Sequence, residues 1–301
     1  MKHVLLSIVA LSLFSVSCIA QDGFFISKER EASQIIIPEI PKNLEFAGER
    51  VPIENYDTRE SLEEDLMVTM YLHSRTMTTL RRTKRYFDII EPMLKEAGIP
   101  EDFKYLAMAE SSLAQEAYSP AKAAGIWQIM STTGKEGGLE VNSTVDERYH
   151  VEKATKVAIK YLKTAKAKFG NWTMAAASYN AGMAGVSRRA TSQGVDSYYD
   201  LFAPTETMRY VFRILSFKIV MSDPQKYGFM LNEFEYYSPY DYKIVKVSGK
   251  NIKWADVAKE NGTTYKIMRE MNPWIRDYSH PNATNKTYDV KIPNTDSRKS
   301  L

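Results

Sequence analysis

Residues 100–113 read PEDFKYLAMAESSL, and this stretch decides the fold. Its apolar side chains recur at helical spacing along one face: Phe103, Leu106, Ala107 and Leu113. Proline is well tolerated at the first position of a helix, so Pro100 is predicted to open this one. Glu110 follows Phe103 by seven residues and Leu106 by four, so its side chain is expected to point inward with them.

A carboxylate on the apolar face of a helix has two interpretations. Burial disfavours the charged form and raises the pKa, which lets Glu110 hold a proton near neutral pH. Such a group can protonate a glycosidic oxygen. Alternatively, Glu110 bends back to water or pairs with an arginine. The helix alone favours this second interpretation.

The rest of the body is also predicted to be helical. Helical spacing of apolar residues begins at Ser61, which forms a capping-box pattern with Glu64. Further helices are expected at 86–94, 151–169, 172–181 and 205–221, with loops and short turns over 119–144. Convincing β-alternation is missing before residue 240. The sequence therefore predicts a mainly α protein with a helical body at 61–235 and an extended lead-in at 21–60.

The C-terminal region, residues 240–295, has a different pattern. Residues 242–247 and 288–292 alternate like strands. Between them, a short helix around Trp254 ends at Gly262, and Thr264 caps a second helix. The order β-α-α-β predicts a small separate module.

The first twenty residues resemble a secretory signal peptide, with a polar head, an apolar stretch and then small residues. Two processing routes fit. Cleavage after Ala20 would release a chain that begins at Gln21, and this route is favoured. Alternatively, residues 15–18 resemble a lipobox, which would place a lipid anchor on Cys18. Because Cys18 is the only cysteine, an internal disulfide is excluded.

Composition excludes several function classes. A formal net charge of +3 is too small to imply nucleic-acid binding. The four histidines are His3, His73, His150 and His280, and they lack the spacing of metal ligands. Neither a metal nor another cofactor is expected.

Four short motifs follow one another in a defined order. They are Glu110-Ser111, the stretch Gly125 to Met130 that contains Gln128, the stretch Ser178 to Gly182 that contains Tyr179 and Asn180, and the helix that begins at Tyr210. Taken singly, each has an ordinary structural explanation, such as packing or a helix C-cap.

In this order and spacing, the motifs resemble those of the lysozyme-like catalytic domain in lytic transglycosylases of the Slt and MltD type. The resemblance covers about residues 85–220. It implies cleavage of the β-1,4 bond between MurNAc and GlcNAc in peptidoglycan glycan strands, with 1,6-anhydro-MurNAc ends as products. It also implies an exported, periplasmic protein.

The resemblance also implies site residues. Glu110 would act first as acid and then as base. The substrate-binding residues it implies are Ser111, Ser119, Gln128, Met130, Tyr179, Asn180 and Tyr210. Gln128 and Tyr179 would hold the N-acetyl group.

A second catalytic carboxylate is not evident, although glycosidases usually use two. Glu116 is six residues after Glu110 and could be nearby, whereas Asp146 and Glu147 are expected to cap the helix at 151–169. This inventory favours one acid, with a hydrolytic lysozyme-like muramidase and a non-catalytic peptidoglycan-binding protein as alternatives.

The C-terminal module is similar to a LysM module, a βααβ unit that binds GlcNAc-containing glycans. Trp254, Ala258 and the closing Ile292-Pro293 fit that pattern. The segment 274–287 is longer than the usual second turn, so a purely structural cap on the catalytic domain remains an alternative.

Overall fold

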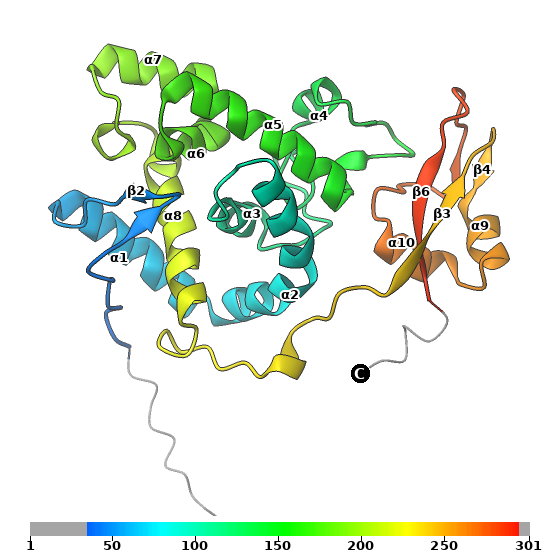
Figure 1. Ribbon diagram of the computed structural model, residues 1–301, viewed down its shortest axis with the longest axis horizontal. Helices are drawn as coiled ribbons and strands as arrows, with labels where there is room; N and C mark the ends of the chain where they lie inside the picture. The colour runs from blue at the N-terminus through cyan, green and yellow to red at the C-terminus, as the bar shows by residue number, and fades with distance from the viewer. Residues whose placement is uncertain (1–34, 295–301) are drawn as a thin grey trace, which may run out of the picture. The chain divides into compact units, whose positions relative to one another are not determined.

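Helices make up most of the protein in the computed structural model, which describes residues 35–294 (Figure 1). The expected signal segment at residues 1–20, with Cys18, lies outside these residues. Within the described part, none of the helices is both long and apolar enough to span a membrane.

The helices of the body confirm the mainly α class. They are α1 (Tyr56–Tyr71), α2 (His73–Glu96), α3 (Phe103–Ser111), α4 (Ser131–Glu136), α5 (Val151–Phe169), α6 (Trp172–Ala181), α7 (Met183–Gln193) and α8 (Thr205–Ser222). Short 3₁₀ turns lie at Glu147–Tyr149, Tyr198–Asp200 and Glu233–Glu235. The predicted helices at 151–169, 172–181 and 205–221 are confirmed almost to the residue.

Three predicted helix starts are wrong. The helix expected at 86–94 is the second half of α2, which begins at His73. α1 begins at Tyr56 rather than Ser61, and Ser61 lies inside it. α3 begins at Phe103 rather than Pro100, because the residues before it form a turn. There the Phe103 N–H bonds the Pro100 carbonyl at 3.1 Å, a tight bond that spans three residues.

A small hairpin precedes α1. Its strands are β1 (Glu45–Phe46) and β2 (Glu49–Arg50), which pair antiparallel. Phe46 is fully buried, and its ring meets the ring of Phe103 edge to face, with 5.3 Å between centroids. The hairpin therefore covers the start of α3.

Helix α3 lies among the other helices, next to α2 and α8 (Figure 1). The apolar residues predicted to face the core, Phe103, Leu106, Ala107 and Leu113, are all fully buried. Burying each of the three larger side chains, Phe103, Leu106 and Leu113, contributes about 1.5–3 kcal/mol, so this face anchors the helix that carries Glu110.

The C-terminal module has the predicted order of elements. They are β3 (Tyr242–Val247), α9 (Trp254–Glu260), α10 (Tyr265–Met271) and β6 (Tyr288–Pro293). β3 and β6 pair antiparallel, with Val245 opposite Val290. The Thr264 hydroxyl caps α10 by accepting from the Ile267 N–H at 3.3 Å. The sequence missed a second pair, β4 (Ile252–Lys253) with β5 (Ser279–His280), which lies partly in the long second turn.

Residues 37–294 belong to one compact unit, in which the body has its own large core and the module's smaller core includes residues of the body. That core gathers module residues with three residues of the body: Ala124, Val145, Tyr149, Ile252, Trp254, Ala258, Met268, Trp274, Ile275, Tyr288, Val290 and Ile292. Because the cluster is shared, the module's packing depends on the body.

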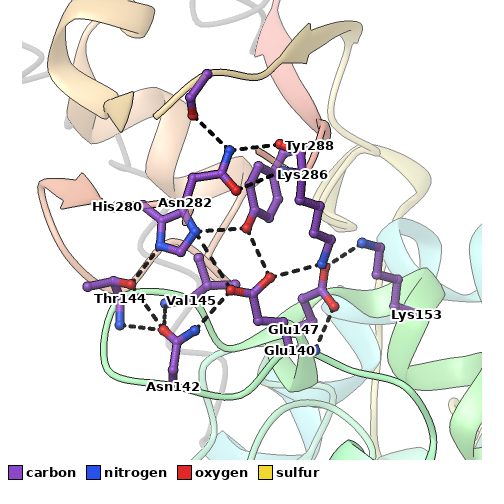
Figure 2. A network of polar contacts seen from close by, with 11 residues as sticks. Glu140, Asn142, Thr144, Val145, Glu147, Lys153, His280, Asn282, Lys286 and Tyr288 are labelled. Carbon is purple, nitrogen blue, oxygen red and sulfur yellow. Dashed lines mark hydrogen bonds and ion pairs between the residues drawn. The ribbon is translucent and has the colours of Figure 1, made fainter. Parts of the chain in front are cut away.

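A polar network also connects the module to the body (Figure 2). The Lys286 ammonium group donates to Glu140 at 2.9 Å and to Glu147 at 3.0 Å. The Tyr288 hydroxyl also donates to Glu140, at 2.9 Å. The buried His280 ring bonds Tyr288 and Thr144, each at 2.8 Å. The junction between the module and the body is thus held by hydrogen bonds as well as by apolar contacts.

Asp146 and Glu147 do not cap the helix at 151–169. The N-cap residue of α5 is His150, and its side chain makes no capping bond. Asp146 instead caps the short turn before α5, accepting from the Arg148 N–H at 3.2 Å. Glu147 is buried and binds lysines, which sequence spacing alone could not distinguish from capping.

Candidate active site

Glu110 lies in the last turn of α3, where the chain leaves the helix abruptly. Ser112 and Leu113 both adopt left-handed backbone angles, with φ of 54° and 55°. Two arginines from α2 hold this turn. Arg75 donates to the Ser112 hydroxyl at 2.9 Å, and Arg82 donates to the Ser112 carbonyl at 3.0 Å. These bonds fix where Glu110 points.

Burial raises the pKa of Glu110 from its usual 4.5 to about 7. A hydrogen bond from Tyr210 and the positive charge of Arg213 partly oppose this shift, while the negative charge of Glu206 adds to it. The carboxyl group is therefore poised to hold or release a proton near neutral pH.

Two tyrosines form the wall next to Glu110. The Tyr210 hydroxyl, from α8, donates to the Glu110 carboxylate. The Tyr179 hydroxyl, from α6, donates to the Trp127 carbonyl at 2.8 Å. Burial raises the pKa of both tyrosines well above 10, so both stay protonated and can act as donors.

Residues 117–130, called the substrate loop below, also line the groove through Ser119, Gln128 and Met130. The loop is folded on itself by backbone bonds, with Gly125 donating to Ala117 at 2.9 Å and Ile129 to Ala124 at 3.0 Å. Gln128 has a positive φ of 47°, and its side-chain amide donates to the Gly125 carbonyl at 2.9 Å. Gln128 is thus held by its own loop.

Two of the expected site residues connect the structural elements around the site. The Ser111 hydroxyl donates to the Ile126 carbonyl at 2.8 Å, which ties α3 to the substrate loop. The Asn180 side chain accepts from the Thr207 hydroxyl at 3.0 Å, which ties α6 to α8.

These elements enclose a groove of about 690 Å³. Among its lining residues are six that the sequence pointed to beside Glu110: Ser119, Gln128, Met130, Tyr179, Asn180 and Tyr210. Ser111 is the expected site residue that does not line it, because its side chain turns to the back of the loop. A groove of this size falls within the usual range of ligand-binding pockets.

The structure adds groove residues that the sequence did not suggest. Arg189 of α7, together with Glu206 and Arg213 of α8, lines the groove. Arg213 lies three residues after Tyr210, so it shares a helix face with it. That spacing was a usable signal, whereas α7 was not predicted at all.

Carboxylates in the groove lining of the described chain are limited to Glu110 and Glu206. Glu116 lies elsewhere, bound to Arg269 at 3.3 Å and Arg276 at 3.5 Å. Asp146 is bound to Arg148 at 2.7 Å. Glu206 is therefore the one alternative partner that the groove offers, and its carboxylate accepts only a long bond from Asn180, at 3.4 Å.

Within residues 35–294, no three His, Cys, Asp or Glu side chains are grouped so as to hold a metal ion.

Comparisons with family models match both parts of the protein. Residues 88–202 match the transglycosylase SLT domain. Residues 243–296 match the soluble lytic transglycosylase C-terminal LysM-like domain.

Two curated proteins are similar to different lengths of this chain. Membrane-bound lytic murein transglycosylase D of Escherichia coli strain K12 is 30% identical over 195 residues, which cover 62% of this chain and 42% of that protein. The chain thus spans less than half of that relative. A putative tributyltin chloride resistance protein of an Alteromonas species is 26% identical over 120 residues, covering 40% of this chain and 58% of the relative.

Solved structures of lytic transglycosylases are also similar. An inactive mutant of lytic transglycosylase Slt from Pseudomonas aeruginosa is 21% identical, with a TM-score of 0.39, over 51% of this chain and 26% of that one. The 70 kDa soluble lytic transglycosylase from Escherichia coli is 22% identical, with a TM-score of 0.39, over 52% of this chain and 27% of that one.

Proposed function

We propose that this chain, whose residues 88–202 match the transglycosylase SLT domain, is a peptidoglycan lytic transglycosylase. It would cleave the β-1,4 bond between MurNAc and GlcNAc and leave 1,6-anhydro-MurNAc ends. The observation that carries the proposal is Glu110, a carboxyl group with a pKa of about 7 that faces a groove of about 690 Å³.

In the first step, protonated Glu110 donates its proton to the glycosidic oxygen as the bond from that oxygen to C1 of MurNAc breaks. Positive charge then develops at C1. In the second step, the Glu110 carboxylate removes the proton from the C6 hydroxyl of the same sugar, and the C6 oxygen bonds to C1. Glu110 ends protonated again, and water is not consumed.

The residues around Glu110 would divide the remaining work. Gln128 and Tyr179 would orient the N-acetyl group as charge develops at C1, because both are polar and held rigidly by hydrogen bonds. Tyr210 would orient the carboxylate that it bonds. Ser119, Met130 and Asn180 would shape the groove, and Ser111 would act from behind by holding the substrate loop.

We assign the chemistry to the helical body at 61–235. We assign the module at 240–295 as a LysM-like unit of the same protein. The partner of the groove is the glycan strand itself.

Hydrolysis is the second candidate, because Glu206 also lines the groove and its charge raises the pKa of Glu110. A hydrolase would need a carboxylate to activate a water molecule. Glu206→Gln distinguishes the two. A lone acid keeps forming anhydro ends in this variant, whereas a hydrolytic pair loses turnover by about a thousandfold.

The test of the main proposal is digestion of purified sacculi followed by mass spectrometry of the released muropeptides. Products with 1,6-anhydro ends are expected, and products with reducing ends alone would establish hydrolysis instead. Glu110→Gln should abolish turnover and keep glycan binding. Unchanged turnover in this variant would remove Glu110 from the mechanism, and absence of turnover in the unaltered protein would leave a binding protein.

The proposed location is outside the cytoplasm, in the periplasm. The amino-terminal sequence supports export, and Cys18 offers a site for a lipid anchor. The mass of the mature protein tests this: a chain that begins at Gln21 carries no anchor, whereas a chain that begins at an acylated Cys18 is heavier by its lipid.

A further inference from the structure

Three residues of the body pair with three residues of the module like neighbouring strands. They are Thr144, Val145 and Asp146 on the body side, and Trp274, Ile275 and Arg276 on the module side. Two backbone bonds close the pairing, each 2.9 Å long, from the Asp146 N–H to the Trp274 carbonyl and from the Arg276 N–H to the Thr144 carbonyl. The module therefore fixes the position of the backbone at Asp146.

From Asp146, a buried ion pair leads toward the groove. Both carboxylate oxygens of Asp146 accept from the Arg148 guanidinium, at 2.9 Å and 2.7 Å. The two side chains are 9% and 6% exposed. A bidentate pair of this kind fixes the direction of the guanidinium plane as well as its position.

The remaining donors of Arg148 grip the substrate loop. The Arg148 side chain donates to the Lys122 carbonyl at 2.8 Å and to the Ile129 carbonyl at 3.1 Å. Lys122 and Ile129 lie on either side of Gly125. One buried cation thus holds both arms of the loop.

The gripped segment includes groove-lining residues. Ile129 lies between Gln128 and Met130, and Lys122 is three residues after Ser119. The loop also has strained backbone, with positive φ at Lys122 and Gln128, so it needs outside support to keep this shape.

We propose that Asp146 and Arg148 are positioning residues that let the LysM-like module hold the substrate loop in its working shape. The inference rests on the proposed function, and it assigns the module a structural part in the reaction. Neither residue touches the substrate. They act through the carbonyl groups that carry the loop holding Gln128.

The first test is Arg148→Lys, which keeps the charge but loses the planar fork that joins Asp146 to two carbonyls. Turnover at saturating glycan should fall about tenfold, with the KM changed by less than about twofold, because the loop acts in the transition state. Amide hydrogen exchange should accelerate at Ala124 and Ile129. Lys246→Gln, which breaks an exposed ion pair in the module, is the control and should change neither readout.

The second test approaches the loop from the module. Ile275→Ala truncates the buried residue opposite Val145, and Ile292→Ala deletes the same atoms from β6. Both variants should lower the melting temperature. Only Ile275→Ala should accelerate exchange in the substrate loop and lower turnover by about threefold or more.

Equal rates of amide hydrogen exchange in the substrate loop of Ile275→Ala and Ile292→Ala would overturn the inference. Unchanged exchange and turnover in Arg148→Lys would also overturn it. The exchange measurement needs no catalysis. A failure of the proposed function, seen as missing anhydro products from the unaltered protein, therefore stays distinguishable from a failure of the coupling.

Discussion

Glu110 carries a proton at neutral pH for a reason that also affects stability. Its folded pKa, about 7, lies above the ordinary value of 4.5, so between these values the folded state binds more protons than the unfolded state. The stability that this group contributes is complete below pH 4.5 and is lost as the pH rises toward 7. Near neutral pH, ionisation of the buried Glu110 therefore lowers the stability of the folded protein.

We expect Glu110→Gln to stabilise the protein in a pH-dependent way. A neutral amide of the same shape avoids the cost of burying a charge, so the gain should be small at pH 5 and reach about 3 kcal/mol at pH 8. Urea unfolding at the two pH values measures it. Glu101→Gln, which removes an exposed carboxylate, is the control, and an equal gain at both pH values would contradict the prediction.

Tyr210 holds the ionised form of Glu110 by donating to it. In Tyr210→Phe the pKa of Glu110 should therefore rise, and the alkaline limb of the pH–rate profile should move up by about 0.5–1 pH unit. Tyr161→Phe deletes a hydroxyl that bonds the Ser178 carbonyl instead, so it should leave the limb in place. A downward shift in Tyr210→Phe would reverse the assigned role of the hydrogen bond.

At the residue scale, the sequence led to seven of the residues that line the groove, Glu110 among them, because short motifs contain residues that cluster in space. Helical spacing alone placed Glu110 among buried neighbours. Arg189 and Glu206 could not be predicted in the same way, because each lies on a helix with an ordinary polar surface and enters the groove only through packing. Asp146 lies only two residues before Arg148 in the sequence, which is compatible with an ion pair. This spacing does not show, however, that the pair is buried.

At the scale of elements, Gly125 is the tightest point of the substrate loop. A Cβ added there would lie 2.1 Å from the Arg148 carbonyl oxygen, and the φ of 79° is itself unfavourable for other residues. Gly138 has a similar φ of 88° with open space around it. Comparing substitutions at the two glycines therefore distinguishes the cost of backbone strain from the cost of steric overlap.

We expect Gly125→Ala to destabilise the protein by more than about 3 kcal/mol, and Gly138→Ala by about 1 kcal/mol, which is the cost of left-handed backbone alone. Denaturant unfolding midpoints of the two variants give the comparison. Similar losses would mean that the loop yields easily around Arg148, against the rigid shape that the groove requires.

Helices with long amphipathic patterns, such as α5 and α8, could be predicted closely because many residues share the signal. Short elements could not. α4 has six residues, β4 and β5 have two each, and their positions depend on what packs against them. The start of α3 was missed for the same reason, since Asp102 accepts from the distant Ala47 N–H and Lys218, and local sequence does not report that contact.

At the scale of the whole molecule, the shared core predicts one unfolding transition. Ala124, Val145 and Tyr149 of the body belong to the same buried cluster as Trp254 of the module, so unfolding of the module would expose part of the body, and we expect the two to unfold together. Calorimetry should give a single peak with equal calorimetric and van't Hoff enthalpies. Two separated peaks would show that module and body unfold independently.

The junction should also make the whole molecule sensitive to acid. Burial lowers the pKa of His280 below 6.5, so its contribution is present above pH 6.5 and is lost as the pH falls. Burial alone would raise the pKa of Glu147, but the Glu140 N–H, Lys153 and Lys286 outweigh it and hold the pKa below 4.5. Its contribution is present above pH 4.5 and is lost below.

Glu147→Gln tests this contribution, because the variant leaves Lys286 and Lys153 with a neutral partner. We expect a loss of about 1–2 kcal/mol at pH 7, because Glu147 is buried whereas the two lysines are about one third exposed and keep part of their hydration. The difference from the unaltered protein should shrink as the pH falls below 4.5, where the native carboxylate also becomes neutral. Asp289→Asn, at an exposed ion pair of the module, should cost less than about 1 kcal/mol at every pH. Urea midpoints from pH 7 to 3 measure both, and a difference for Glu147→Gln that stays constant over this range would place the acid sensitivity outside the junction.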